Sequence, residues 1–283
     1  MFKRALTRPD GRGLWLYSRA PIPDSIIATS PGNAAGGVEP RSHLRWHPLR
    51  GEWVAYATHR QQRTFLAPAE FNPLAPTTDP HQPTELPAGG YDVAVFENRF
   101  PTFSANPGPA PEGLGIETAP AGGSAEVVVF TQDASASLGS LPLEHLALIV
   151  DVWKDRPFEN RGVEVGVTLN HPHGQIYAYP FVPPIPAREL ERQRAFHAEH
   201  GRGLLASVLA SERADGRRIL FDVGDAVAFM PAFARYAYEI WMMPAAPLPS
   251  LADMDGASAR AMARVMKAVF KRSTGSGTGP SPM

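Results

Sequence analysis

The pentapeptide HPHGQ, residues 171–175, lies between two apolar runs, VEVGVT at 163–168 and IYAY at 176–179. Both runs are rich in β-branched and aromatic residues, which favour strands, so the sequence predicts a strand on each side. Side chains two residues apart on an extended chain point to the same side, which places both imidazoles and the glutamine amide on one face. The proline fixes φ between the imidazoles, and the glycine lets another group approach the backbone closely. This arrangement is typical of a histidine that attacks phosphorus.

His173 is the candidate nucleophile of this segment. A neutral imidazole is nucleophilic near pH 7, and a covalent bond to phosphorus splits one difficult transfer into two easier steps. The attacking nitrogen must be unprotonated, so the other ring nitrogen must donate its proton to a fixed acceptor, such as a backbone carbonyl. Gln175 is the candidate ligand of a phosphate oxygen. A bare H-x-H pattern also allows two surface histidines in a turn or a pair of metal ligands, but the whole string between two strands favours the nucleophile.

The composition limits the class of protein. The chain has 283 residues, enough for one large domain or two small ones, and a net charge of -1, which gives no electrostatic reason to bind a nucleic acid polymer or a membrane surface. It has no cysteine, which excludes disulfides and thiolate metal sites. No apolar run approaches about 20 residues, and the first residues lack the apolar core of a signal peptide. We therefore expect a cytoplasmic protein without a membrane span.

Hydrophobic periodicity predicts the regular elements. Leu143, Leu146, Ile149, Val150 and Trp153 recur at helical spacing, and Asp253 is the expected N-cap of the last helix. The stretches 21–40, 68–87 and 107–123 are rich in proline and glycine and predict long loops. The predicted strands are 14–17, 52–57, 92–96, 126–131, 164–168, 175–179, 218–222, 226–230 and 239–243, and the predicted helices are 142–155, 187–200, 203–213 and 253–271.

Two stretches of the chain look like copies. DVAVFENRFPTF at 92–103 is similar to DAVAFMPAFARY at 225–236, and each is followed by a further strand and then a helix. The sequence therefore predicts an α+β fold with an internal duplication.

Several motifs together resemble the galactose-1-phosphate uridylyltransferases, a branch of the histidine-triad superfamily. They are HPHGQ continuing into IYAYPFVPP, the FENRG segment at 158–162, THRQQR at 58–63 and VFENRFP at 95–101. The resemblance extends from about Leu44 to Arg272. It implies duplicated histidine-triad-like halves that form a broad antiparallel sheet with packed helices, the second half being incomplete, and a homodimer.

The resemblance also implies a division of the chain. It gives an N-terminal extension at 1–41, partly disordered, and a first half with HPHGQ at 42–202. An incomplete second half follows at 203–272, and 273–283 is a disordered tail with the composition of a linker.

The implied activity is the exchange of UMP between UDP-glucose and galactose 1-phosphate in galactose metabolism, the Leloir pathway. The mechanism would be ping-pong through uridylyl-His173, with Gln175 on the transferred phosphate. At the position of Arg99 the family carries an acidic residue, so this chain departs from the pattern there. The residues implied to contact the phosphates, ribose or uridine are Arg60, Arg63, Asn98, Arg99, Asn160, Gly166, Val167 and Thr168, besides Gln175.

Two positions match metal ligands of the family. His171 lines up with a ligand of structural zinc, but the accompanying C-x-x-C pair reads Asn72-Pro73-Leu74-Ala75 here. Zinc sites need about four ligands, so we expect a structural His171, no zinc and no required cofactor. Glu189 lines up with a carboxylate of a second metal site, whose histidine partners would lie beyond Ser273.

The tail at 273–283 stands where the second repeat would continue in the family. We therefore expect a shortened form with impaired stability and weak selectivity for the hexose. Two other functions remain open from the residues: a related nucleotidyl-histidine hydrolase or phosphorylase, and an inactive nucleotide-binding remnant.

Overall fold

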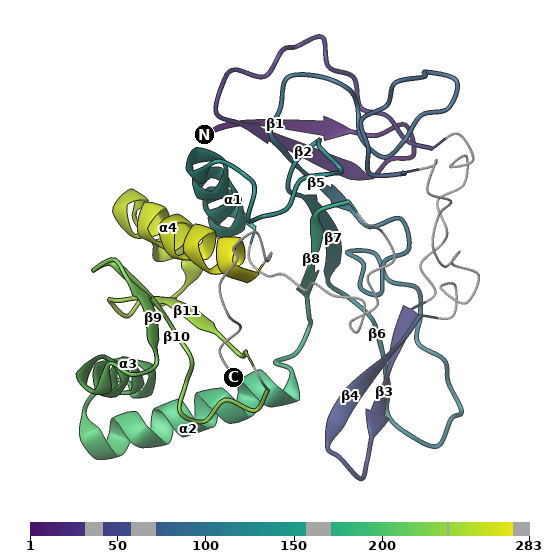
Figure 1. Cartoon of the computed structure of the whole chain (residues 1–283). Coiled ribbons are helices and arrows are strands. Elements are labelled where there is room, and N and C mark those ends of the chain that lie inside the picture. Colours follow the sequence, from purple (N-terminus) through teal and green to yellow (C-terminus); the bar gives the residue numbers. More distant parts are fainter. Residues whose placement is uncertain (32–41, 58–71, 157–170, 237, 274–283) are drawn as a thin grey trace. The chain divides into compact units, whose positions relative to one another are not determined.

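The computed structural model describes residues 1–31, 42–57, 72–156, 171–236 and 238–273, drawn in colour in Figure 1. They form two compact units. Unit 1 comprises the described residues within 1–135 and 158–184, and unit 2 those within 136–157 and 185–283. Of the candidate site residues that are described, all lie in unit 1 except Glu189.

A five-stranded antiparallel sheet forms the centre of unit 1. Its strands, in spatial order, are β1 (Phe2–Thr7), β2 (Gly13–Ser18), β5 (Val93–Glu97), β7 (Ser124–Val129) and β8 (His173–Ala178). A second antiparallel sheet has the order β4 (Glu52–Ala57), β3 (Ser42–His47) and β6 (Thr118–Pro120).

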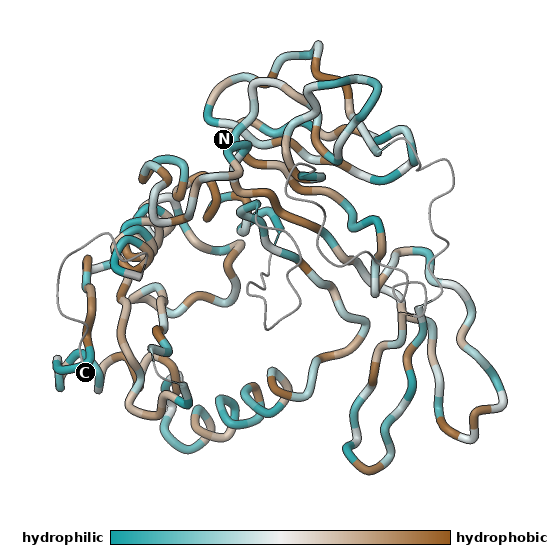
Figure 2. The backbone as a smooth tube through the Cα atoms, turned by 45° about the vertical axis from the view of Figure 1, so that its right-hand side comes forward, coloured by the Kyte–Doolittle hydropathy of each residue, from teal (hydrophilic) through white to brown (hydrophobic). Residues whose placement is uncertain are grey.

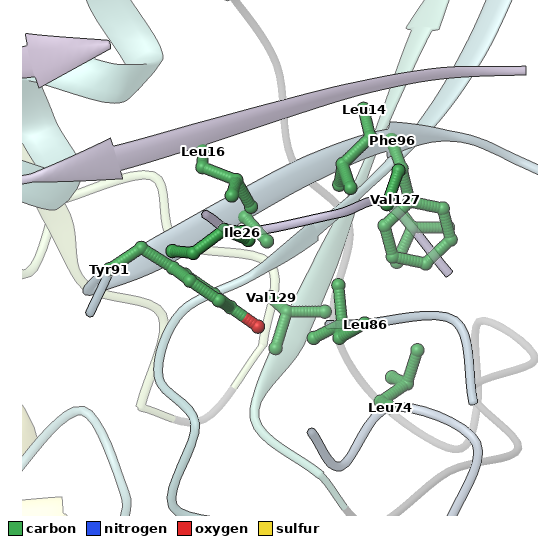
Figure 3. Packing of buried hydrophobic residues seen from close by; sticks show 11 residues of the cluster. Leu14, Leu16, Ile26, Leu74, Leu86, Tyr91, Phe96, Val127 and Val129 are labelled. Carbon is green, nitrogen blue, oxygen red and sulfur yellow. The ribbon is translucent and has the colours of Figure 1, made fainter. Parts of the chain in front are cut away.

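One face of the five-stranded sheet carries the main core of unit 1 (Figure 3). Alternate residues of the strands point to this face, and loop residues around Ile26, Leu74 and Leu86 cover it. Leu14, Leu16 and Leu86 are fully buried, and each contributes about 1.5–3 kcal/mol relative to an exposed side chain. The strand residues of this cluster are Leu14, Leu16, Ala94, Phe96, Val127 and Val129.

Unit 2 has a three-stranded antiparallel sheet between helices. The sheet has the order β9 (Ile219–Asp222), β10 (Ala226–Phe229) and β11 (Trp241–Pro244). Ala226 and Ala228 pack against α4 (Gly256–Ser273), and Val227 and Phe229 pack on the other face with Leu209 of α3 (Leu204–Asp215). The unit also contains α1 (Leu143–Asp155) and a short 3₁₀ helix, η3 (Leu251–Asp253).

Helix α2 (Pro184–His200) differs from the others in having no buried residue. Most of its length is hydrophilic in Figure 2, whereas brown segments mark the apolar strands. Glu189 is exposed on this helix. This is the usual environment of a glutamate near a helix N-terminus, where the helix dipole favours a negative charge. None of the described helices is long and apolar enough to cross a membrane.

The α+β class and the antiparallel sheet are confirmed, and so are most of the predicted elements. All four helices occur close to their predicted positions, and eight of the nine predicted strands correspond to observed ones, the ninth (164–168) lying outside the described residues. Strands β1, β3 and β6 were not predicted. The expected N-cap at Asp253 is wrong, because Asp255 accepts the Ser258 amide at 2.7 Å and Asp253 lies in η3.

Candidate functional site

The site begins at the edge strand β8, where His173 is the first residue. His173 pairs with Val129 of β7, so it lies on the core face of the sheet, and it is 6% exposed. Its Nδ1 lies 2.7 Å from the carbonyl oxygen of His171. Since a carbonyl only accepts, Nδ1 carries the proton and the lone pair is on Nε2. A histidine held in this tautomer can attack an electrophile through Nε2.

His171 is held by two further hydrogen bonds and is only 2% exposed. Its Nε2 donates to the carbonyl of Thr131 at 2.7 Å, and its Nδ1 lies 3.0 Å from the amide nitrogen of Asn72. Burial lowers the pKa of His171 below its usual value, although the bond to Thr131 acts in the opposite direction. The ring is therefore a neutral, fully bonded part of the interior.

These contacts do not fit a zinc ion at His171. Both ring nitrogens already have hydrogen-bond partners, and an asparagine amide stands where the first cysteine of the family pair is expected. Across the described ranges, there is no cluster of three or more His, Cys, Asp or Glu side chains that could hold a metal ion. Glu189 belongs to unit 2, whereas His171 belongs to unit 1.

Gln175 lies two residues beyond His173, pairs with Val127 and therefore shares the same face. Its Oε1 accepts a hydrogen bond from the hydroxyl of Tyr177. In this arrangement the Nε2 group of Gln175 keeps its two N–H donors for another acceptor. Tyr177 is itself positioned by edge-on contact with Phe103, with ring centroids 6.4 Å apart.

Asn98 directly follows β5. Its backbone N–H donates to the carbonyl of Ala125 at 2.8 Å, which adds one hydrogen bond to the pairing between β5 and β7. Ala125 pairs with Tyr177, so Asn98 lies two strands from β8 on the same face. The side-chain oxygen of Asn98 accepts the Phe100 amide at 2.9 Å, which closes a tight turn. Arg99, the next residue, is half-buried, with its guanidinium 5.6 Å from the Phe100 ring centroid.

The structure thus places His171, His173, Gln175 and Asn98 in unit 1, with His173, Gln175 and Asn98 on one face of the five-stranded sheet. Three partners in this group were not predicted: Asn72, Thr131 and Tyr177. The i, i+2 spacing of Gln175 and Tyr177 on a strand could have identified the last of them. The remaining candidates lie outside the described residues: Arg60, Arg63, Asn160, Gly166, Val167 and Thr168.

Several known proteins are similar to this chain in sequence and in fold. The family of the galactose-1-phosphate uridyl transferase N-terminal domain matches residues 37–183. The galactose-1-phosphate uridylyltransferase of Streptomyces lividans is 34% identical over 85% of this chain and 68% of its own length. That of Thermotoga maritima is 32% identical over 80% of this chain and 74% of its own length.

A solved uridylyltransferase structure has a similar fold, with a TM-score of 0.68 and 27% identity over 80% of this chain and 73% of that one. The family match covers more than half of the chain and includes the whole HPHGQ segment. The chain therefore belongs to the galactose-1-phosphate uridylyltransferase family of nucleotidyltransferases.

Proposed function

We propose that this chain exchanges the uridylyl group between UDP-glucose and galactose 1-phosphate through a covalent uridylyl-His173. Nε2 of His173 would attack the α-phosphorus of UDP-glucose, and the bond to the bridging oxygen would break, releasing glucose 1-phosphate. A phosphate oxygen of galactose 1-phosphate would then attack the same phosphorus, displace the imidazole and give UDP-galactose. The observation that carries this proposal is the bond from Nδ1 of His173 to the His171 carbonyl, which leaves the lone pair on Nε2.

The same hydrogen bond supports the covalent intermediate. When Nε2 bonds to phosphorus the imidazole becomes positively charged, and the carbonyl dipole on Nδ1–H stabilises that charge. The Nε2–H donors of Gln175 lie on the same face and would bind the oxygens on which negative charge develops.

Further candidate residues, several of them outside the described ranges, would bind the nucleotide. Asn98 and Arg99 would contact the uridine or ribose, together with Asn160. Arg60 and Arg63 would bind the diphosphate, since a guanidinium can donate two hydrogen bonds to one phosphate. Residues 166–168 would contribute backbone and hydroxyl contacts to the phosphates.

The direct test is a single-turnover reaction with UDP-glucose labelled at the α-phosphate. We expect label on the protein and one equivalent of glucose 1-phosphate released, because the first half-reaction needs no second substrate. Adding galactose 1-phosphate should then transfer the label to UDP-galactose. Label transferred instead to inorganic phosphate or to water would identify a phosphorylase or a hydrolase, and binding without labelling would identify an inactive remnant.

A smaller effect is expected from Tyr177→Phe. Without the hydroxyl, Oε1 of Gln175 loses its donor and the amide can rotate, so fewer molecules present Nε2–H to the phosphate. We expect kcat to fall about tenfold, which corresponds to one neutral hydrogen bond, while KM for UDP-glucose changes little. Steady-state kinetics would measure this, with Tyr179→Phe as the matched control on the same segment; equal rates in both variants would contradict the role of Tyr177.

We also propose that the internal repeat reflects two copies of one α+β unit. In unit 1, β2, β5 and β7 are antiparallel neighbours, and in unit 2, β9, β10 and β11 are antiparallel neighbours in the same chain order. The similar sequences contain β5 in one copy and β10 in the other, and a helix follows each third strand along the chain. These parallels support a duplication.

A further inference from the structure

We propose that Asn72 is a positioning residue for His173, and that a metal-free chain of hydrogen bonds through Asn72 and His171 fixes the nucleophile. This inference rests on the proposed role of His173. Asn72 stands at a position that matches a zinc-binding cysteine of the family, and its partner His171 lies 99 residues away in the sequence.

The first step is the orientation of the Asn72 amide. The backbone N–H of Leu74 donates to Oδ1 of Asn72 at 3.0 Å, and only the oxygen of the amide can accept. Nδ2 must therefore face His171. The Ala75 amide donates to the Asn72 carbonyl at 3.1 Å, so the turn is closed by its own backbone and presents Nδ2 without a metal.

The second step is the tautomer of His171. Nδ2 of Asn72 has only N–H donors, so Nδ1 of His171, 3.0 Å away, must accept. The ring proton is then on Nε2, which donates to the Thr131 carbonyl at 2.7 Å. The opposite tautomer would place two donors face to face at Nδ1 and two acceptors at Nε2. Because the ring is 2% exposed, water cannot relieve such a mismatch.

The third step connects this ring to the nucleophile. The carbonyl of His171 accepts the Nδ1–H of His173 at 2.7 Å, so the peptide plane of His171 sets the imidazole direction. The next carbonyl, of Pro172, accepts the Phe130 amide at 3.1 Å. Thr131 and Phe130 are neighbours, so the segment is held on one side by the His171 ring and on the other by the Pro172 backbone. Loss of the Asn72 bond would loosen the first of these supports.

The fourth step explains why zinc is not needed here. A zinc ligand uses an imidazole lone pair, and in His171 the lone pair on Nδ1 already accepts from Asn72. The chain has no cysteine to supply thiolates. The side-chain amide of Asn72 instead joins the turn at Asn72 to the segment before β8, as a structural zinc ion would.

Three variants test the proposal against their wild type. Asn72→Ala removes both amide groups. Asn72→Asp keeps an acceptor for the Leu74 amide but replaces the donor to His171, which separates the folding of the turn from the bond to the ring. Asn106→Ala, at an exposed asparagine of the same unit, is the matched control. Each is assayed in the labelled single-turnover reaction, and ¹⁵N NMR reports the tautomer of His171.

We expect Asn72→Ala and Asn72→Asp to lower the rate of uridylylation about 10- to 100-fold, as is typical for residues that orient a functional imidazole, with KM changed less than threefold. The wild type should show the Nε2–H tautomer of His171, contain no stoichiometric zinc by elemental analysis and keep its rate after chelator treatment. Unchanged rates in folded Asn72 variants, an Nδ1–H tautomer, or zinc whose removal abolishes labelling would each overturn the proposal. A wild type that never becomes labelled would instead contradict the role of His173, and the tautomer would still test the hydrogen-bond chain.

Discussion

Replacing His173 with glycine is expected to abolish uridylyl exchange. The variant lacks the only group proposed to bond to phosphorus, so both half-reactions are lost and not just slowed by weaker binding. We expect the rate to fall by roughly 10⁴-fold or more, as for the loss of a nucleophile in other covalent enzymes. The measurement is transfer of the α-phosphate label to the protein, followed by exchange with galactose 1-phosphate.

The control for this variant is His81→Gly, at an exposed histidine in a loop of the same unit. His81→Gly should keep both the labelling and the exchange rate. Circular dichroism should show whether both variants are folded, so that loss of labelling can be assigned to the missing imidazole and not to unfolding. A His173→Gly protein that still carries label on a histidine would assign the nucleophile to another residue.

The elements that the sequence predicted correctly share a strong local pattern. Helix α1 has apolar residues at helical spacing, and β5 and β7 contain runs of consecutive buried residues, VAVF and VVV, which is typical of strands buried on both faces. The three strands that were not predicted lack such a pattern. β1 reads FKRALT and has no buried residue, β3 contains two histidines and an arginine, and β6 has only three residues. β1 and β6 are edge strands, which tolerate charged residues because one side faces solvent, so their pairing is decided by the neighbouring strand. β3 lies between β4 and β6, and its pairing depends on these two partners.

The candidate site divides in the same way between local and distant contacts. The shared face of His173 and Gln175 follows from the period of a strand and was predicted. The carbonyl that accepts the Nδ1–H of His173 belongs to a residue two positions away, which local reasoning also allowed. The bond between Asn72 and His171 could not be predicted, because nothing in either segment specifies a partner 99 residues away. Asn72 was interpreted only as a lost cysteine, whereas the fold gives it a new partner.

Replacing Arg8 with methionine is expected to destabilise unit 1 strongly. The Arg8 side chain is fully buried next to β1, and its guanidinium donates to the carboxylate and the backbone carbonyl of Glu85. Burial lowers the pKa of Arg8 to about 10, against the opposing effect of Glu85, which shows that the site is costly for a charge without a partner. The guanidinium also lies 4.3 Å from the centroid of the Phe96 ring, in the main core.

The expected loss follows from what the substitution leaves behind. Glu85 would keep its ion pair with Arg12 at 2.8 Å but lose the buried partner, so a carboxylate that is 9% exposed would be only half satisfied. Removing one member of a buried pair costs about 3–5 kcal/mol, because the remaining charge is desolvated. Urea unfolding followed by tryptophan fluorescence would measure the free energy of unfolding.

Two further variants make this measurement decisive. Arg50→Ala breaks an ion pair to Glu52 in which the arginine side chain is 71% exposed, so it should cost about 1 kcal/mol or less. The double variant Arg8→Met with Glu85→Gln removes both charges of the buried pair and should recover part of the loss, since no carboxylate is then left uncompensated. If Arg8→Met lowered the free energy of unfolding no more than Arg50→Ala does, the buried Arg8–Glu85 pair would not be an important source of the stability of unit 1. If the double variant were less stable than Arg8→Met alone, the stability would come from the Glu85–Arg12 contact and not from the Arg8–Glu85 pair.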